Sequence, residues 1–92
     1  MYSKKTVVVN ATGLHARPAS DFVKAAKGYA SRITIANLST PEEEPVNAKS
    51  IISVLSLGMG KGTEVEVCAN GDDEQAAVDA LVALIEGGFG EL

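Results

Sequence analysis

Apolar and polar positions alternate along several stretches of the chain, and this period of two predicts strands. A β-branched run at residues 6–11 predicts a first strand, well buried because three valines follow one another at 7–9. Alternation predicts half-buried strands at residues 31–38 and 63–70, and a short edge strand is expected at 46–48. In the two alternating strands, the residues expected to face the core are Ile33, Ile35, Val65, Val67 and Ala69.

Three other stretches repeat their apolar positions at helical spacing. The first begins near residue 16 and meets a natural stop at Gly28. The second is a compact apolar segment of about two turns, with Ser50 as the expected N-cap and Gly58 as the stop. The third begins at Asp72, which has capping-box-like spacing to the glutamine three residues on. Its apolar stripe is expected to comprise Ala76, Ala77, Ala80, Leu81, Leu84 and Ile85, ending at Gly87-Gly88.

The predicted order is strand, helix, strand, strand, helix, strand, helix, and it indicates an α+β fold. Runs this short favour a four-stranded, mainly antiparallel sheet with helices on one face. A ferredoxin-like arrangement opens in the same order and remains an alternative on pattern alone. Residues 1–92 contain no repeat and no linker, and we expect a single domain.

Composition and charge exclude several classes of function. With 46% hydrophobic residues, 22% charged residues and a net charge of −4, the chain is of ordinary globular composition and lacks a concentrated basic face. Direct binding to nucleic acid is therefore not expected. Cys68 is the only cysteine, so neither an internal disulfide nor a Cys/His metal cluster can form, and no cofactor is expected. No stretch approaches the length of a signal peptide or a membrane span, which predicts a cytoplasmic protein without membrane insertion.

The segment TGLHARPAS, residues 12–20, contains the only histidine of the chain. Pro18 is compatible only with the first turn of a helix, so the helix must begin close to His15 and leave the amides of Ala16 and Arg17 unpaired. Unpaired amides at the positive end of the helix dipole form an anion site, and this field favours a neutral, nucleophilic imidazole. The arrangement suits a phosphoryl acceptor with Arg17 as a bidentate ligand of the phosphoryl oxygens. A histidine that merely caps the helix is the alternative.

A second set of residues indicates a docking surface for a partner. Arg17 and Lys24 lie seven residues apart and share a helical face, which Lys27 and Lys49 extend. The second helix carries Ile51, Ile52, Val54 and Leu55, more apolar positions than one buried stripe needs. A basic rim around an apolar patch suits acidic partners, whereas burial of all four apolar residues would leave no such patch. The glycine-rich residues 57–63 lack the spacing of a P-loop and are interpreted as a flexible turn.

Two segments together resemble the HPr family, the histidine-containing phosphocarriers of the bacterial sugar phosphotransferase system. TGLHARPAS resembles the active-site segment of that family, and VNAKSIISVLSLGMGKG, residues 46–62, resembles its second signature in the serine-regulated form. The two segments agree with the family in order and spacing, so the resemblance covers essentially the whole chain. It implies an open-faced β-sandwich of four antiparallel strands with three helices on one side.

The resemblance also implies partners and residue roles. Enzyme I would phosphorylate His15 with phosphoenolpyruvate, Arg17 would stabilise the phosphoryl group, and sugar-specific permease components would receive it. Ser50 matches the serine that HPr kinase/phosphorylase modifies, and the phosphorylated form of the family binds a catabolite-control transcription factor. We expect a monomer that carries a phosphoryl group and is not itself an enzyme. One departure is visible, because the acidic loop between residues 37 and 47 is a few residues longer than the family usual.

Two other functions remain open from the sequence. One is a regulatory binding module, similar to relatives of the family that lack the histidine and act only through the serine. The other is an HPr-like carrier of a nitrogen-related phosphotransfer chain, which uses the same chemistry. The intact histidine motif argues against the first alternative, and the serine-rich second signature argues against the second.

Overall fold

The computed structural model describes residues 1–90, in which four strands and three helices follow the predicted order. A short 3₁₀ turn, η1, follows the last helix at Gly88–Gly90. The elements are β1 (Tyr2–Val7), α1 (Ala16–Lys27), β2 (Arg32–Asn37), β3 (Val46–Asn47), α2 (Ile51–Ser56), β4 (Glu64–Asn70) and α3 (Glu74–Glu86).

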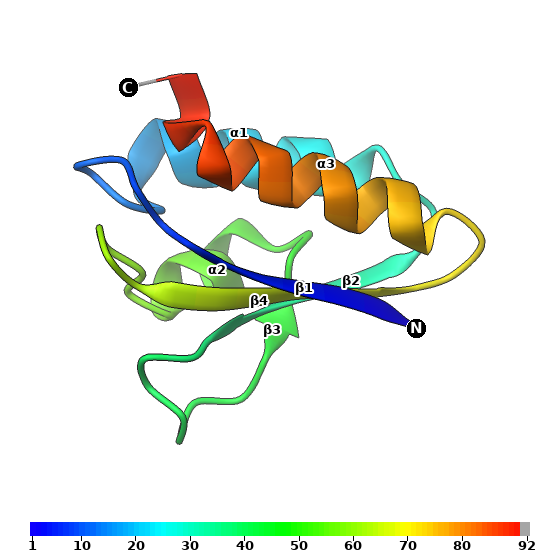
Figure 1. Cartoon of the computed structure of the whole chain (residues 1–92), viewed down its shortest axis with the longest axis horizontal. Helices are drawn as coiled ribbons and strands as arrows, with labels where there is room; N and C mark the ends of the chain where they lie inside the picture. The colour runs from blue at the N-terminus through cyan, green and yellow to red at the C-terminus, as the bar shows by residue number, and fades with distance from the viewer. Residues whose placement is uncertain (91–92) are drawn as a thin grey trace.

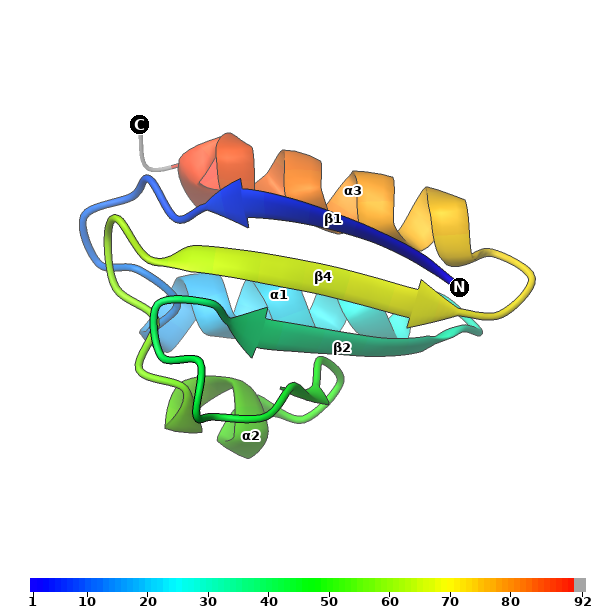
Figure 2. The same cartoon turned by 60° about the horizontal axis from the view of Figure 1, so that its bottom comes forward.

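The strands form one sheet in the order β1-β4-β2-β3, and every neighbouring pair is antiparallel. Strand β4 therefore lies between β1 and β2, where Val67 is the register partner of both Lys4 and Ile35 (Figure 2). The ferredoxin-like alternative would place β1 beside β3 in the middle of the sheet, whereas here β1 and β3 lie at opposite edges, so the strand order excludes it.

The sheet carries α1 and α3 on the same face, while α2 packs beside α1 and near β3 (Figure 1). The alternation of β4 is as predicted, because Val65, Val67 and Ala69 are buried and the residues between them are half-buried or exposed. Phe22 of α1 and Leu81 of α3 are fully buried in the same cluster. The predicted open-faced β-sandwich is confirmed.

The first strand lies several residues earlier than predicted. It runs over Tyr2–Val7 and not over residues 6–11, because its partner β4 ends its register at the pair Val7–Glu64. Of the three successive valines, only Val8 is fully buried, and Val7 is 40% exposed. The edge position of β1 explains why its residues lack an apolar alternation: Ser3, Lys4 and Lys5 are all exposed, and Lys4 pairs with Asp79 of α3 (2.8 Å).

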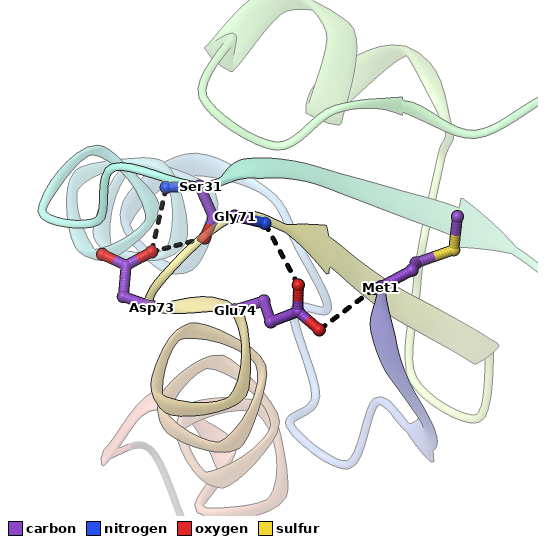
Figure 3. A network of polar contacts seen from close by, with 5 residues as sticks. All are labelled: Met1, Ser31, Gly71, Asp73 and Glu74. Carbon is purple, nitrogen blue, oxygen red and sulfur yellow. Dashed lines mark hydrogen bonds and ion pairs between the residues drawn. The ribbon is translucent and has the colours of Figure 1, made fainter.

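The third helix begins one residue later than predicted, and its cap side chain serves another segment. Asp73, not Asp72, is the N-cap residue, and its carboxylate makes no hydrogen bond to its own helix. It instead accepts a hydrogen bond from the amide of Ala30 (2.8 Å). It also accepts from the amide and the hydroxyl of Ser31, as Figure 3 shows. The hydroxyl of Ser31, and then the amide of Ala30, lower the pKa of the Asp73 carboxyl from its ordinary value. The capping box predicted at Asp72 was wrong, because Asp73 is the N-cap residue and its carboxylate is bonded to Ala30 and Ser31.

Glu74 completes this junction by joining the N-terminus of the chain to the start of α3 (Figure 3). Its carboxylate accepts from the amide of Gly71 (3.2 Å) and lies 3.1 Å from the terminal ammonium of Met1. These two contacts, the amide first, lower the pKa of Glu74. The end of β4, the start of α3 and the start of β1 are thereby held together at the end of the sheet where β1 begins.

The buried face of α3 is rotated relative to the predicted stripe. Its buried residues are Ala77, Val78, Leu81, Val82 and Ile85, so the two valines replace Ala76 and Ala80, which are exposed. An alanine-rich helix offers several faces of similar hydrophobicity, and packing on β1 and β4 selects the one with the larger side chains. In the described part of the chain, none of the helices combines the length and apolar character needed to cross a membrane.

Candidate functional site

His15 stands at the start of α1 as an exposed side chain between two buried anchors. It is the N-cap residue, with extended backbone angles (φ −124°, ψ 158°), and its side chain makes no capping hydrogen bond. The neighbouring Leu14 is fully buried, and Pro18, three residues on, is also buried in the first turn. The predicted helix start is confirmed, and the geometry leaves the imidazole free for chemistry while the backbone on both sides is held.

The loop that presents His15 is held by the glycine-rich segment before β4. The amide of Leu14 donates to the carbonyl of Met59 (2.8 Å), and Gly13 adopts a left-handed conformation (φ +66°). A Cβ atom on Gly13 would clash with the Met59 carbonyl oxygen and lie 2.6 Å from the Cα of Gly60. Only glycine fits this close approach. Residues 57–63, interpreted from sequence as a flexible turn, therefore form part of the support for His15.

The first turn of α1 presents two free amides beside His15. Among residues 1–90, neither the amide of Ala16 nor that of Arg17 meets a hydrogen-bond acceptor, and the first turn contains no acidic side chain. Both residues are exposed, so the amides form the kind of anion site expected at a helix start. Ala16 also has φ +49°, an unfavourable conformation for a residue with a Cβ atom. The sequence carried no signal for this strain, because alanine is ordinarily a good helix former.

Arg17 borders a hollow of about 320 Å³ that the sequence analysis did not anticipate. The hollow is lined by Arg17, Pro18, Asp21, Phe89 and Gly90, which brings the C-terminal turn beside the start of α1. Phe89 has a left-handed backbone (φ 56°) between two glycines with positive φ, and its side chain packs on the core. Because the contributing residues are some 70 positions apart, only the fold brings them together.

Ser50 is half-buried and caps α2 as predicted. Its hydroxyl oxygen accepts from the amide of Ser53 (3.3 Å), and its carbonyl accepts from the amide of Val54 (3.0 Å). The helix ends at Ser56, and Gly58 follows with φ +61°, which agrees with the predicted stop. Capping accounts for the place of Ser50 at the start of α2.

Among the basic residues predicted to dock a partner, two line a surface groove and a third is bonded within the protein. Lys24, Lys27 and Ile51 line one groove of about 350 Å³ together with Ser20 and Val23, so α1 and α2 present a continuous basic and apolar surface. Lys24 and Lys27 also lie in the last turn of α1, where they complement the helix dipole. Lys49 differs, because it is half-buried and its ammonium donates to the carbonyl of Tyr29 (2.7 Å). The ammonium of Lys49 therefore also makes a structural contact, in addition to its predicted place at the basic rim.

The second helix buries only one of its four large apolar residues. Val54 is fully buried, whereas Ile52 is 79% exposed and Ile51 and Leu55 are each nearly two-fifths exposed. The alternative that all four belong to the core is wrong, and an apolar patch is present on the surface. Residues 1–90 contain no group of three or more His, Cys, Asp or Glu side chains placed to bind a metal ion.

Comparison with known proteins identifies close relatives over nearly the whole chain. A family model described as the PTS HPr component phosphorylation site matches residues 2–87. Phosphocarrier protein HPr of Haemophilus influenzae is 44% identical over 85 residues, which cover 92% of this chain and 95% of that protein. HPr-like protein Crh of Halalkalibacterium halodurans is 42% identical over 86 residues, covering 94% of this chain and 98% of that protein. The crystal structure of HPr-C-His from Thermoanaerobacter tengcongensis superposes with a TM-score of 0.92 at 44% identity, covering 100% of this chain and 99% of that one.

Proposed function

Because the chain belongs to the HPr family of phosphocarriers, we propose that it accepts a phosphoryl group from enzyme I on His15 and passes it to sugar-specific permease components. Residues 1–92 would act as one HPr-like carrier domain, which is phosphorylated transiently and is not a catalyst on its own. The observation that carries the proposal is the exposed, uncapped His15 beside the two free amides at the start of α1.

The chemistry needs only groups that this site presents. A lone pair on a ring nitrogen of His15 attacks the phosphorus, a P–N bond forms, and the bond between phosphorus and the donor breaks with its electron pair leaving on the donor. The amides of Ala16 and Arg17 and the guanidinium of Arg17 then hold the phosphoryl oxygens by charge-assisted hydrogen bonds. In the onward transfer His15 is the leaving group: a nucleophile of the permease component attacks the phosphorus, and the P–N bond breaks with its electron pair returning to the ring nitrogen, so no cofactor is required.

Partner recognition is proposed for the surface formed by α1 and α2. Enzyme I and the permease components would contact the apolar residues Ile51, Ile52 and Leu55, with Lys24 and Lys27 steering acidic partners toward them. The contribution of Lys49 is expected to be smaller because its ammonium is already bonded to Tyr29. Steering of this kind weakens as salt is added.

Regulation through Ser50 is a further part of the proposal. A phosphate on the cap of α2 would meet the free amides and the dipole of that helix, so modification leaves the fold intact. It would also place negative charge beside Ile51 and Ile52, which repels an acidic enzyme I. HPr kinase/phosphorylase would add the group, and a catabolite-control transcription factor would bind the modified surface.

A regulatory module that acts only through Ser50 is the second candidate. It is favoured by the 42% identity to HPr-like protein Crh, whose relative in Bacillus subtilis is described as a catabolite repression HPr. The two functions differ in whether His15 takes up phosphate.

The test is incubation of the protein with phosphoenolpyruvate and enzyme I, followed by measurement of acid-labile phosphate. We expect stoichiometric labelling of the wild type and none of His15→Ala, with both proteins showing the same thermal unfolding. An unlabelled wild type would leave the regulatory module as the better explanation. Persistent labelling of His15→Ala would show that another residue carries the phosphoryl group.

A further inference from the structure

Asn10 is a fully buried polar residue that precedes His15 by five positions and takes no part in the proposed phosphoryl chemistry. Its side-chain amide donates to the carbonyl of Gly13 (2.9 Å) and to the hydroxyl of Thr12 (3.2 Å). Its backbone carbonyl accepts from the amide of Gly13 (3.2 Å). Burial of a side-chain amide is costly unless its donors are bonded, so these contacts hold residues 10–13 in one compact loop.

The peptide unit between Gly13 and Leu14 is held at both of its polar ends. Its carbonyl accepts from Asn10, and its amide donates to the carbonyl of Met59 (2.8 Å). Because a peptide unit is planar and rigid, bonds at the carbonyl and at the amide together fix its orientation. Glycine would otherwise permit many orientations, since its backbone has the widest conformational range. The Asn10 amide therefore helps to select the direction in which the chain leaves Gly13.

The orientation of His15 depends on this direction, because the imidazole makes no capping hydrogen bond of its own. Only Leu14, which is fully buried, separates the fixed peptide unit from His15. A phosphoryl group on the imidazole has to reach the amides of Ala16 and Arg17 at the same time. A misplacement of about 1 Å at a reacting group can slow a reaction about a hundredfold, so a loop that sets this direction affects the transfer step.

We propose that Asn10 is a positioning residue for His15: its side-chain amide fixes the Gly13–Leu14 peptide unit and so directs the imidazole toward the amides at the start of α1. This inference rests on the proposed function for its effect on phosphoryl transfer, whereas the order of the loop can be measured without it. Loss of the Asn10 amide should lower the rate of the transfer step more than the affinity for enzyme I, because the proposed docking surface lies on α1 and α2.

The kinetic test compares Asn10→Ala with Val78→Ala, the truncation of a fully buried residue in the second turn of α3. Helix α3 begins at the end of the sheet where β1 begins, whereas the loop at 10–13 follows the other end of β1 (Figure 2). With enzyme I and phosphoenolpyruvate, we expect Asn10→Ala to lower kcat for phosphorylation of His15 by about ten- to a hundredfold and to leave KM nearly unchanged. Val78→Ala should lower the urea midpoint and leave both kinetic constants at their wild-type values. An unchanged kcat in Asn10→Ala, or an equal fall in Val78→Ala, would overturn the proposal.

The structural test measures amide hydrogen exchange in the unphosphorylated protein by nuclear magnetic resonance. The amide of Leu14 should exchange at least about tenfold faster in Asn10→Ala, whereas the amide of Val8, which donates to the carbonyl of Thr63 (2.9 Å), should stay protected. Equal acceleration of both amides, or none at Leu14, would mean that Asn10 stabilises the fold without positioning His15. If the wild type takes no label but Leu14 alone loses protection in Asn10→Ala, the proposed function fails and the role of Asn10 in fixing the loop stands.

Asn10→Ser is the second variant, for use if Asn10→Ala does not fold. It removes the amide donors and leaves a small polar group that can bond within the loop, so it should show the same pattern in both tests with a smaller loss. If neither variant folds, Asn10 is required by the whole structure, and a role specific to His15 is overturned.

Discussion

The starts of α1 and α2 are built in opposite ways although both follow an extended residue. At α2, the side chain of Ser50 caps the helix by accepting from the amide of Ser53, and its backbone carbonyl accepts from the amide of Val54. At α1, His15 occupies the same position without a capping bond, and Ala16 takes a left-handed conformation. The third amide of α2 thus bonds to the cap, whereas Pro18 holds the third position of α1 and has no N–H, so the start of α1 depends on residues elsewhere for support.

The comparison shows that the start of α1 lacks local stabilisation and is held by residues elsewhere in the chain. A hydroxyl at position 15 would have no amide of residue 18 to bond, because Pro18 lacks an N–H, so a side-chain cap of the kind seen at α2 is not available to α1. The support comes instead from buried Leu14 and Pro18 and from the contact of Gly13 with the loop at 59–60. Strain that persists because surrounding structure determines it is typical of functional sites.

Replacing Gly13 should produce the largest effect on stability, because α1 relies on this contact in place of a cap. Gly13→Ala adds a left-handed alanine and a backbone clash, and we expect a loss of about 2–4 kcal/mol in the free energy of unfolding. Gly58→Ala is the matched control, since Gly58 has a similar φ of +61° but no atom within 4 Å of the added Cβ. Its expected cost is about 1–2 kcal/mol, from conformation alone. Equal losses in urea denaturation would show that the contact with residues 59–60 contributes nothing.

Replacing Arg17 should affect transfer and leave stability nearly unchanged. The guanidinium makes no described ion pair and stands at the wrong end of the helix dipole for a cation. Arg17→Ala should therefore slow phosphorylation of His15 by more than tenfold, which corresponds to about 1.4 kcal/mol. Arg17→Lys keeps the positive charge but loses the bidentate geometry, so its rate should lie between those of the wild type and Arg17→Ala. Quenched-flow assays measure the rate of phosphoryl transfer, and thermal unfolding measures the stability of the fold. A lower melting temperature with unchanged transfer would assign Arg17 to the fold.

Substitutions of Ser50 test the capped start. Ser50→Ala should lose about 0.5–2 kcal/mol of stability through the missing cap and still permit normal phosphorylation of His15. Ser50→Asp can cap the helix while adding charge, so it should keep the thermal stability and slow phosphorylation by enzyme I. If the two variants transfer alike and differ only in melting temperature, Ser50 is a cap and has no regulatory role.

Local patterns predicted most elements and the position of His15, because period and turn chemistry act over a few residues. The α1 start followed from Pro18, and the α2 cap followed from Ser50. The β1 position did not follow, since its limits are set by pairing with β4, which is distant in sequence. The capping role predicted for Asp72 was wrong for a related reason. Asp73 is the N-cap residue, and its carboxylate accepts a hydrogen bond from Ser31, which is distant in sequence.

The surroundings of the site could not be predicted from the sequence for a related reason. The clash at Gly13 involves residues 59–60, and the hollow beside Arg17 is closed by Phe89. In the sequence, Gly13 is only a glycine near a histidine, and Phe89 is only an aromatic residue between two glycines. The left-handed backbone of Ala16 goes against the helical preference of alanine, so the residue type gives no sign of it.

The start of α3 provides the smallest and most conditional test, because its cap residue stabilises a junction between segments. The hydroxyl of Ser31 and the amide of Ala30 lower the pKa of Asp73 from its ordinary value of 3.8. A carboxyl whose pKa is lowered by folding stabilises the protein above its unfolded-state pKa, and this stabilisation is lost as the pH falls through the lower folded-state value.

Asp73→Asn should therefore lower the urea midpoint near neutral pH, and the difference from wild type should shrink as the solution is acidified below about pH 4. Asp72→Asn, one residue away and without a described contact, should follow the wild type throughout. If the deficit of Asp73→Asn stays constant across this range, the charge of Asp73 does not contribute to holding Ala30 and Ser31.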